Sequence, residues 1–270
     1  MNKVSVIMSV YNTKDYNMLK QAIDSILDQT YQHFEFIICD DGSNDSTYNY
    51  LVEFAKKDKR IIIIQNKDNL TLGPALNHCL AIARYQYIAR MDADDISLPN
   101  RLELELEYLE KHRDVALVGT NVKLINDNSE VIGSRKYPMF LKKEDFIINC
   151  AICHPTIMMK KDVLERIGGY SKKKEHIRAE DYELFLRMIT KDYKMVNLEE
   201  ELFLYRQNLH NCKQSKYKYC INEYKLREEY IPKLFRGKVK SYYIIKPLLV
   251  GLIPKVIYKK LKKLQTKVLK

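Results

Sequence analysis

The sequence has no tryptophan and little glycine or proline, with 8 and 7 of these residues in 270. This scarcity excludes collagen-like and low-complexity chains. No apolar run reaches the roughly 20 residues of a membrane-spanning helix, because lysines and prolines interrupt the longest candidate, Tyr242 to Tyr258. No secretory signal is recognisable either, since Met1 to Tyr11 resembles a short apolar strand without a small-residue cleavage site. We therefore expect a globular protein that stays in the cytoplasm.

The sequence also lacks a cysteine framework. Its 6 cysteines are irregularly spaced, and a cytoplasmic protein keeps its thiols reduced. Cys150 to His154 has the C-x-x-C-H spacing of haem attachment, but in bacteria that attachment takes place outside the cytoplasm. A zinc site that includes His210 and Cys212 would need a second C-x-x-C pair to complete it. We expect free, buried thiols instead.

Two motifs of common enzyme classes are missing. A dinucleotide oxidoreductase would carry G-x-G-x-x-G after its first strand, where this chain has Ser9 to Asn12. A phosphatase of the haloacid dehalogenase type would carry a D-x-D-x-T motif near its amino terminus. The only comparable segment here, Asp92 to Ile96, comes late and lacks the threonine.

The net charge of +11 is unevenly distributed. Lys233 to Lys270 contains 12 Lys or Arg and no Asp or Glu, so the remainder of the chain is almost neutral. A nucleic-acid-binding protein more often spreads its basic residues over a folded face, interleaved with aromatic residues. We therefore expect no nucleic-acid partner.

Within the basic tail, apolar residues recur at helical spacing from Leu248 to Val268, and most lysines fall between them. A basic amphipathic helix of this kind can lie on an anionic membrane. We expect residues 216–270 to form a helical extension that contacts the inner face of the cell membrane. The alternative is a helix that packs on the rest of the protein and exposes its basic side to solvent.

The first two thirds of the chain alternate β-branched runs with amphipathic segments, which is typical of a mainly parallel sheet flanked by helices. We therefore predict an α/β fold. The expected strands are Val4–Val10, Glu35–Cys39, Ile61–Gln65, Tyr87–Met91, Val115–Val118, Val122–Ile125 and Thr156–Lys160. The expected helices are Leu19–Gln29, Ser46–Lys56, Gly73–Ala83, Pro99–Glu110 and Glu180–Lys191.

Polar residues follow several of these strands: Tyr11 and Asn12, Asp40 and Asp41, and the segment Asp92 to Asp95. Ligands of open α/β sheets bind beyond the carboxyl ends of the strands, so these residues should converge. Asp92 and Asp94 alternate along the chain and should place their carboxylates on one face. Two carboxylates about 6 Å apart repel by roughly 3 kcal/mol at an effective dielectric of about 20, and a divalent cation would reverse that repulsion. Carboxylate ligands favour Mg²⁺ or Mn²⁺.

These residues also permit simpler interpretations. Asp92 to Asp95 could be solvated loop residues that cap the helix near Pro99. Asp40 and Asp41 could serve the turn at Gly42, or they could accept hydrogen bonds from a base or ribose while Tyr11 stacks on the base.

Seven segments together resemble glycosyltransferase family 2, in that family's order and over about residues 3 to 205. They are Val4–Asn12, Ser25–Tyr31, Asp40–Thr47, Tyr87–Asp95, Cys153–Thr156, Gly168–Tyr170 and Ala179–Arg187. The resemblance implies a GT-A nucleotide-diphospho-sugar transferase fold, with residues 1–215 as the catalytic domain.

The resemblance also implies roles for individual residues on the donor side. It places Ser9, Tyr11 and Asp41 around the nucleobase, usually uracil, with Asp40 nearby. Asp92 would approach the ribose or the metal, and Asp94 would coordinate Mn²⁺ or Mg²⁺. Asn77 matches a family position near the donor, although a helix-surface amide is an equally good interpretation.

On the acceptor side, the resemblance makes Asp181 the catalytic base, because attack by a hydroxyl needs a carboxylate within hydrogen-bond reach. Without the resemblance, Glu180 and Asp181 would be acids favoured by a helix amino terminus. Glu180 and His154 are candidate acceptor-side residues, and His154 could equally be a structural histidine.

The expected function is inverting transfer of a sugar from a nucleotide-diphosphate sugar, of which a UDP-sugar is the expected type. The acceptor would be a hydroxyl of a glycan or of a polyprenyl-linked or other lipid-linked molecule in surface polysaccharide biosynthesis. The alternative is a membrane-associated nucleotide-binding or scaffold protein that has the same fold but no turnover.

Overall fold

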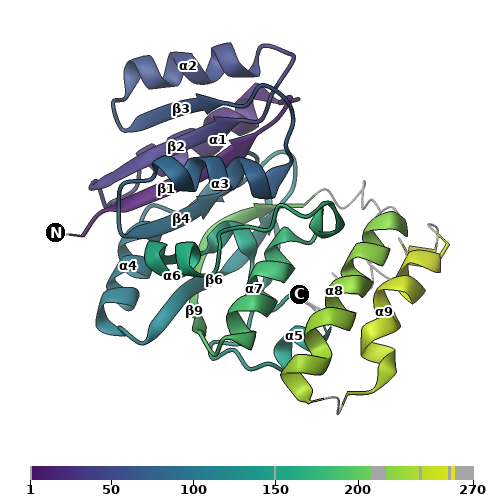
Figure 1. Cartoon of the computed structure of the whole chain (residues 1–270). Helices are drawn as coiled ribbons and strands as arrows, with labels where there is room; N and C mark the ends of the chain where they lie inside the picture. Colours follow the sequence, from purple (N-terminus) through teal and green to yellow (C-terminus); the bar gives the residue numbers. More distant parts are fainter. Residues whose placement is uncertain (1, 149, 208–216, 237–238, 255–256, 259–270) are drawn as a thin grey trace.

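The computed structural model describes residues 2–148, 150–207, 217–236, 239–254 and 257–258. Within these residues, nine strands form one mixed sheet in the order β3-β2-β1-β4-β8-β6-β9-β5, and β7 pairs with β6 (Figure 1). The strands are β1 Val4–Val10, β2 Phe34–Asp40, β3 Ile61–Gln65, β4 Tyr87–Met91, β5 Ile96–Ser97, β6 Val115–Ile125, β7 Val131–Arg135, β8 Met158–Lys160 and β9 Lys194–Arg206. The α-helices are α1 Tyr16–Leu27, α2 Thr47–Lys57, α3 Leu72–Ile82, α4 Arg101–Lys111, α5 Asp145–Ile148, α6 Lys161–Arg166, α7 Glu180–Thr190, α8 Tyr217–Phe235 and α9 Ser241–Leu252.

The first four strands are parallel neighbours, as the alternation of strands and helices predicts. Side chains on one side of β1, such as Val6 and Met8, pack with α1, α2 and α4. Side chains on the other side, such as Ile7, pack with α3 and α7. Because both faces are covered, these strands are almost continuously apolar instead of alternating with polar residues.

The second half of the sheet differs from the prediction first at β6. The segment expected to form two strands, Val115–Val118 and Val122–Ile125, is the single strand β6, and Gly119 lies inside it. A Cβ at Gly119 would lie 2.8 Å from Oδ1 of Asn197 on the neighbouring β9. The glycine therefore permits a close approach of two strands, where its turn propensity suggested a break.

Several other elements were not predicted. The strand β9 is 13 residues long, and its sequence includes three consecutive glutamates that hide its pattern. The strand β7 begins at Val131, inside a segment that was expected to be turn-rich. The helix α6 was also missed, whereas α8 lies within residues 216–270, which were expected to be helical.

The helices α8 and α9 pack side by side at one end of the molecule, and α8 contacts α7 (Figure 1). Pro254 follows the end of α9, as expected for a residue that disfavours helix in its predecessor. The predicted amphipathic pattern continues to Val268, but residues 259–270 lie outside the described residues. Among the helices that the structure describes, none is long and apolar enough to span a bilayer.

The cysteines agree with the expectation of reduced thiols where they are described. Cys39, Cys79, Cys150, Cys153 and Cys220 are free. Cys212 and His210, considered above as zinc ligands, lie outside the described residues.

Candidate active site

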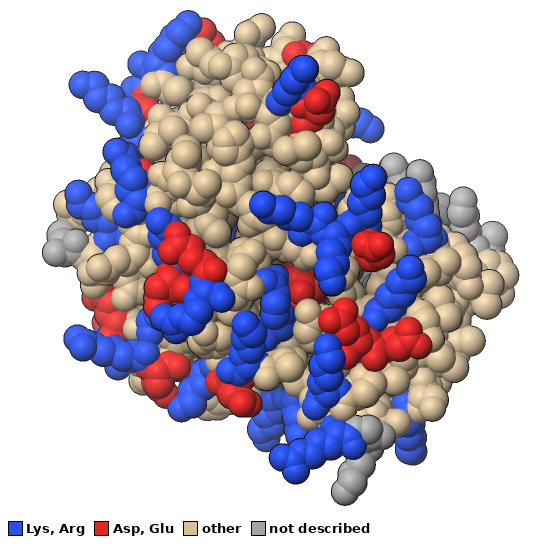
Figure 2. Space-filling view, viewed as in Figure 1, with Lys and Arg blue, Asp and Glu red and all other residues tan. Residues whose placement is uncertain are grey.

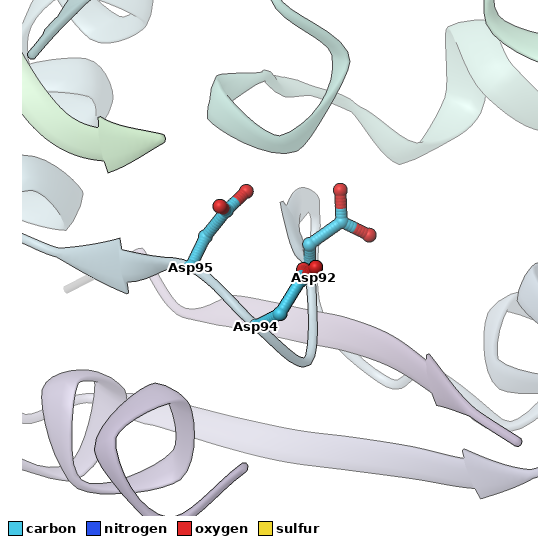
Figure 3. A group of neighbouring side chains, drawn as sticks. All are labelled: Asp92, Asp94 and Asp95. Carbon is cyan, nitrogen blue, oxygen red and sulfur yellow. The ribbon is translucent and has the colours of Figure 1, made fainter. Parts of the chain in front are cut away.

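Three carboxyl side chains gather in the loop that follows β4. One oxygen from each of Asp92, Asp94 and Asp95 lies within 4.8 Å of the others, and the side chains project to the same side of the loop (Figure 3). Asp92 is half-buried, Asp94 is exposed and Asp95 is buried. The predicted proximity of Asp92 and Asp94 is confirmed, and Asp95 joins them.

The electrostatics of this group disfavour three negative charges. Desolvation by the surrounding protein, followed by the negative charge of Asp92, raises the pKa of Asp94 to about 6. Burial, followed by the charges of Asp92 and Asp94, raises the pKa of Asp95 well above its ordinary value. A bound divalent cation would remove this repulsion, and carboxylate oxygens are the ligands that Mg²⁺ and Mn²⁺ prefer. The residues therefore fit a divalent cation.

Arg206, at the end of β9, holds the loop in place. Its backbone N–H donates to Oδ1 of Asp95 at 2.7 Å, and its Nε donates to the backbone oxygen of Asp94 at 2.7 Å. The rest of its guanidinium donates to the 126–129 turn and to Gln21. Oδ2 of Asp95 has no hydrogen-bond partner among the described residues. Asp95 thus anchors the loop by one oxygen, keeps the other available, and does not cap α4, whose N-cap residue is Asn100.

Asp92 is paired from within the protein by Arg90 of β4. Nη2 of Arg90 lies 2.5 Å from Oδ1 of Asp92, and the Arg90 side chain is almost completely buried. Nε and Nη1 of Arg90 have no partner among the described residues. Buried donors of this kind are costly, so this side chain is retained at a cost in stability.

Asp40 and Asp41 lie at the end of β2 and are both buried. Oδ1 of Asp41 accepts hydrogen bonds from Nδ2 of Asn66 at 2.7 Å and from the backbone N–H of Leu70 at 3.0 Å. The side chain of Asp40 accepts one hydrogen bond, from Gln65 to Oδ2, and its Oδ1 has no partner in the described part of the chain. Asp41 therefore shapes the loop after β3, whereas Asp40 keeps an unused acceptor.

The ends of β1 and β2 are joined at the same edge of the sheet. Asn12 has a positive φ of 45°, its N–H donates to Ser43, and its side-chain oxygen accepts from the N–H of Asn44. This arrangement leaves the neighbouring Tyr11 49% exposed, which is unusual for an aromatic ring beside a core strand. Ser9 lies on β1 and is partly buried. Because β1 pairs in parallel with both β2 and β4, the carboxyl ends of these three strands lie at one edge of the sheet, as predicted.

Asp181 begins the first turn of α7. Its Oδ1 accepts a hydrogen bond from the backbone N–H of Tyr182 at 2.7 Å. Burial, with a smaller contribution from Glu180, raises the pKa of Asp181 to about 6, while Arg90 acts in the opposite direction. Glu180 itself is buried. The positive charge of Arg90 therefore acts on both Asp92 and Asp181, which are far apart in sequence.

His154 is buried, and its Nε2 lies 2.9 Å from the hydroxyl of Tyr170. Burial and the charge of Arg90 hold the pKa of His154 well below its ordinary value, so the ring is neutral. Its edge also contacts Phe185 of α7. These contacts give His154 a packing role beside Asp181.

Asn77, on α3, hydrogen-bonds the backbone of Tyr170 with both ends of its amide. Nδ2 donates to the Tyr170 oxygen, and Oδ1 accepts from the Tyr170 N–H, both at 2.8 Å. Gly169 has a φ of 69°, and a Cβ there would lie 2.4 Å from Oδ1 of Asn77. The structure therefore assigns Asn77 to fixing the Gly-Gly-Tyr turn.

Three residues of this site were not identified from the sequence: Arg90, Tyr170 and Arg206. A signal existed for Arg90, because a charged residue inside an apolar strand, two positions before Asp92, must share its face. The sequence contained no such signal for Arg206, because this residue is 111 positions from Asp95.

Comparison with known proteins agrees with this geometry. Residues 5–168 match the model for glycosyl transferase family 2. Over 256 residues, which are 94% of this chain and 91% of the relative, the sequence is 37% identical to the putative glycosyltransferase EpsE of Bacillus subtilis. It is also 37% identical to the O-antigen biosynthesis glycosyltransferase WbnJ of Escherichia coli, over 84% of this chain and 89% of the relative.

Among solved structures, Staphylococcus aureus TarS 1-349 in complex with UDP-GlcNAc is similar, with a TM-score of 0.67 and 16% identity. The similarity covers 93% of this chain and 71% of TarS 1-349. At this identity it establishes the fold, which is the GT-A fold that the sequence motifs imply. The sequence match and the carboxylates at the strand ends lead to the same assignment, and this chain belongs to glycosyl transferase family 2.

Proposed function

We propose that this protein is an inverting, metal-dependent glycosyltransferase that moves a sugar from a UDP-sugar to an acceptor hydroxyl in surface polysaccharide biosynthesis. The observation that carries the proposal is the group of three carboxyl side chains after β4, whose member Asp92 pairs with the buried Arg90. This group can hold a divalent cation, and the raised pKa of Asp181 suits a base. Residues 1–215 would form the catalytic domain and 216–270 the extension.

The proposed metal ligands are Asp92 and Asp94, with Asp95 available through its unpartnered oxygen. The repulsion that raises the pKa of Asp94 supports an ion at this position. When bound, Mn²⁺ or Mg²⁺ supplies positive charge that stabilises the departing diphosphate.

On the nucleotide side, the exposed ring of Tyr11 would stack on the base beside Ser9. The buried, unpartnered Oδ1 of Asp40 supports a role as acceptor for an N–H of the base, and the occupied Oδ1 of Asp41 supports a role in holding the loop around it. The complex of TarS with UDP-GlcNAc supports a uridine nucleotide as donor. Asn77 is not part of this proposal, because the Tyr170 backbone uses both ends of its amide.

On the acceptor side, Asp181 would take the proton of the attacking hydroxyl. A base works best when its pKa is close to the working pH, and the pKa of about 6 brings Asp181 nearer to that condition. Glu180 and His154 would line this side without exchanging protons. The acceptor would be a glycan or a polyprenyl-linked sugar, a class supported by the name of WbnJ, an O-antigen biosynthesis enzyme.

The deciding experiment measures nucleotide release from UDP-sugars in Mn²⁺ and in chelator, with glycan and polyprenyl-linked acceptors. We expect turnover in Mn²⁺ that chelation abolishes. Asp181→Asn should lose at least about 100-fold in rate. Asp192→Asn, the same change in the exposed turn after α7, should keep wild-type activity.

The same experiment distinguishes the alternative, a scaffold protein without turnover. If calorimetry detects nucleotide binding but no donor is turned over, the result would favour the scaffold. Full activity of Asp181→Asn would instead exclude Asp181 as the base.

A further inference from the structure

The helix α9 has an outward face made only of large apolar side chains. Tyr242, Ile245, Leu249 and Leu252 are 55, 40, 46 and 66% exposed. Their spacing of three, four and three residues places them on one side of the helix. We refer to these four residues as the α9 stripe. Such a row of exposed apolar residues is uncommon on a soluble surface and marks a contact with another apolar phase.

The orientation of α9 is fixed by its opposite side. Pro247 is buried, and a Cβ at Gly251 would lie 2.8 Å from the ring of Tyr217 and 2.9 Å from Sγ of Cys220, both on α8. Nη1 of Arg227, on α8, donates to the backbone oxygen of Tyr243 at 3.0 Å. The α9 stripe therefore cannot turn inward without breaking this packing.

The segment that contains and follows α9 carries charge of one sign. From Tyr230 to the end of the sequence there are 12 Lys or Arg and no Asp or Glu. Arg236 and Lys240, just before α9, are exposed. In Figure 2, the outer side of α9, at the right, is mainly uncharged, and both basic and acidic side chains lie on the neighbouring face. An apolar stripe with a basic border complements an anionic lipid surface, whose headgroups are negative and whose interior is apolar.

We infer that the α9 stripe is the surface by which this protein docks on an anionic membrane. At 1.5 Å per residue, the 12 residues of α9 extend about 18 Å, too short to cross a bilayer of about 30 Å. The helix therefore lies in the plane of the interface, with the stripe among the lipid chains and the basic residues at the headgroups.

A lipid fits this surface better than a protein. One face of a 12-residue helix is small beside the roughly 800 Å² that a stable protein partner covers, and a bilayer needs no complementary shape. The inference goes beyond the proposed glycosyl transfer, since it concerns a face remote in sequence from Asp92 and Asp181. It would bring the enzyme to acceptors held in a membrane.

The test is sedimentation of the full-length protein with vesicles of phosphatidylglycerol and phosphatidylcholine, compared with pure phosphatidylcholine. We expect binding to the anionic vesicles at 0.1 M salt and at least tenfold weaker binding to the neutral ones. The double variant Leu249→Glu with Leu252→Glu should bind the anionic vesicles at least tenfold more weakly. Each change places a charge at a position where the leucine side chain would lie among the lipid chains. Val131→Glu with Ile82→Glu adds the same charge at exposed apolar positions on the α/β body and should leave binding unchanged.

Three outcomes would overturn the inference. The wild type fails to bind anionic vesicles, the α9 variant binds as the wild type does, or the control variant loses as much binding as the α9 variant. A dimer seen by analytical ultracentrifugation without lipid, and lost in the α9 variant, would assign the stripe to a second copy of the chain. Donor hydrolysis in solution, measured in parallel, should be equal in all variants, so failure of docking is distinguishable from failure of the proposed activity.

Discussion

Arg90 and Asp92 form an ion pair across the boundary between the protein interior and the active site, with 2.5 Å between Nη2 and Oδ1. Arg90 is almost completely buried, whereas the side chain of Asp92 is 31% exposed. The pair orients the carboxylate of Asp92 from the side of the protein interior. The positive charge of Arg90 also acts to lower the pKa of Asp181 and that of His154. One buried cation thus acts on the loop after β4, on the start of α7 and on His154.

Replacement of Arg90 tests this arrangement. In Arg90→Met, Asp92 loses its only described ion-pair partner and lies beside two further acids. We expect kcat to fall by about 100-fold, since a displacement of about 1 Å in a positioned group can have that effect. Arg90→Lys keeps the charge without the planar fork and should recover part of the loss. Steady-state kinetics at saturating donor, with thermal unfolding as a folding control, would measure it. Wild-type kcat in a folded Arg90→Met protein would contradict this role.

The activity should depend on pH through Asp181. Because its pKa is raised to about 6, the carboxylate is protonated and inactive as a base below that pH. We expect kcat at saturating metal to fall about tenfold per pH unit below about 6 and to level off above about 7. A rate profile that stays flat from pH 5 to 8 would argue against Asp181.

The contribution of Asp181 to the free energy of unfolding should change with pH in the opposite direction to its contribution to kcat. The pKa of Asp181 is raised from 3.8 to about 6, so the folded state binds its proton more tightly than the unfolded state does. Its contribution to the free energy of unfolding therefore falls as pH rises between about 4 and 6, by at most about 3 kcal/mol. Solvent contact reduces this figure, since the residue is only partly buried. Asp181→Asn removes the buried charge, and we expect a higher Tm at pH 7.5 but no gain at pH 4.

Removal of the metal should destabilise the protein. Mn²⁺ at about 100 times its Kd would add about 2.7 kcal/mol to the free energy of unfolding. Asp94→Asn should raise the Tm of the metal-free protein slightly, because it relieves repulsion from Asp92 and Asp95, and should lose the Mn²⁺-induced increase. Differential scanning fluorimetry with and without Mn²⁺ would measure both effects. Asp114→Asn, an exposed acid paired with Lys194, is the matched control and should retain the full metal response.

Asn77 offers a clear choice between a structural and a ligand-binding role. Asn77→Ala leaves the N–H and the oxygen of Tyr170 without the partners they have in this structure, at a cost of about 1–3 kcal/mol. We expect a lower Tm with an almost unchanged KM for the donor. The reverse result, a stable protein whose donor KM rises tenfold or more, would restore the donor contact that the sequence left open.

Most of the parallel half of the fold could be predicted from the sequence. The strands β1 to β4 carry apolar runs bounded by polar residues, and local pattern is sufficient where both faces of a strand are buried. The second half was less predictable, because its strands depend on distant partners. Gly119, for example, lies inside β6, where a Cβ would be 2.8 Å from Oδ1 of Asn197 on β9.

The sequence by itself determined the family, the carboxylates that follow β2 and β4, and the acidic start of α7, because these residues are contiguous motifs at the ends of regular elements. Only the tertiary structure decided which of them keep unused hydrogen-bonding atoms. It gave Asp41 to the loop after β3 and Asn77 to Tyr170, and it left Asp40 and Asp95 each with one buried oxygen that has no partner among the described residues. It also paired the buried Arg90 with Asp92. The reason is that hydrogen-bond partners and desolvation depend on groups that are far apart in sequence. Local periodicity does not predict which of these groups come together.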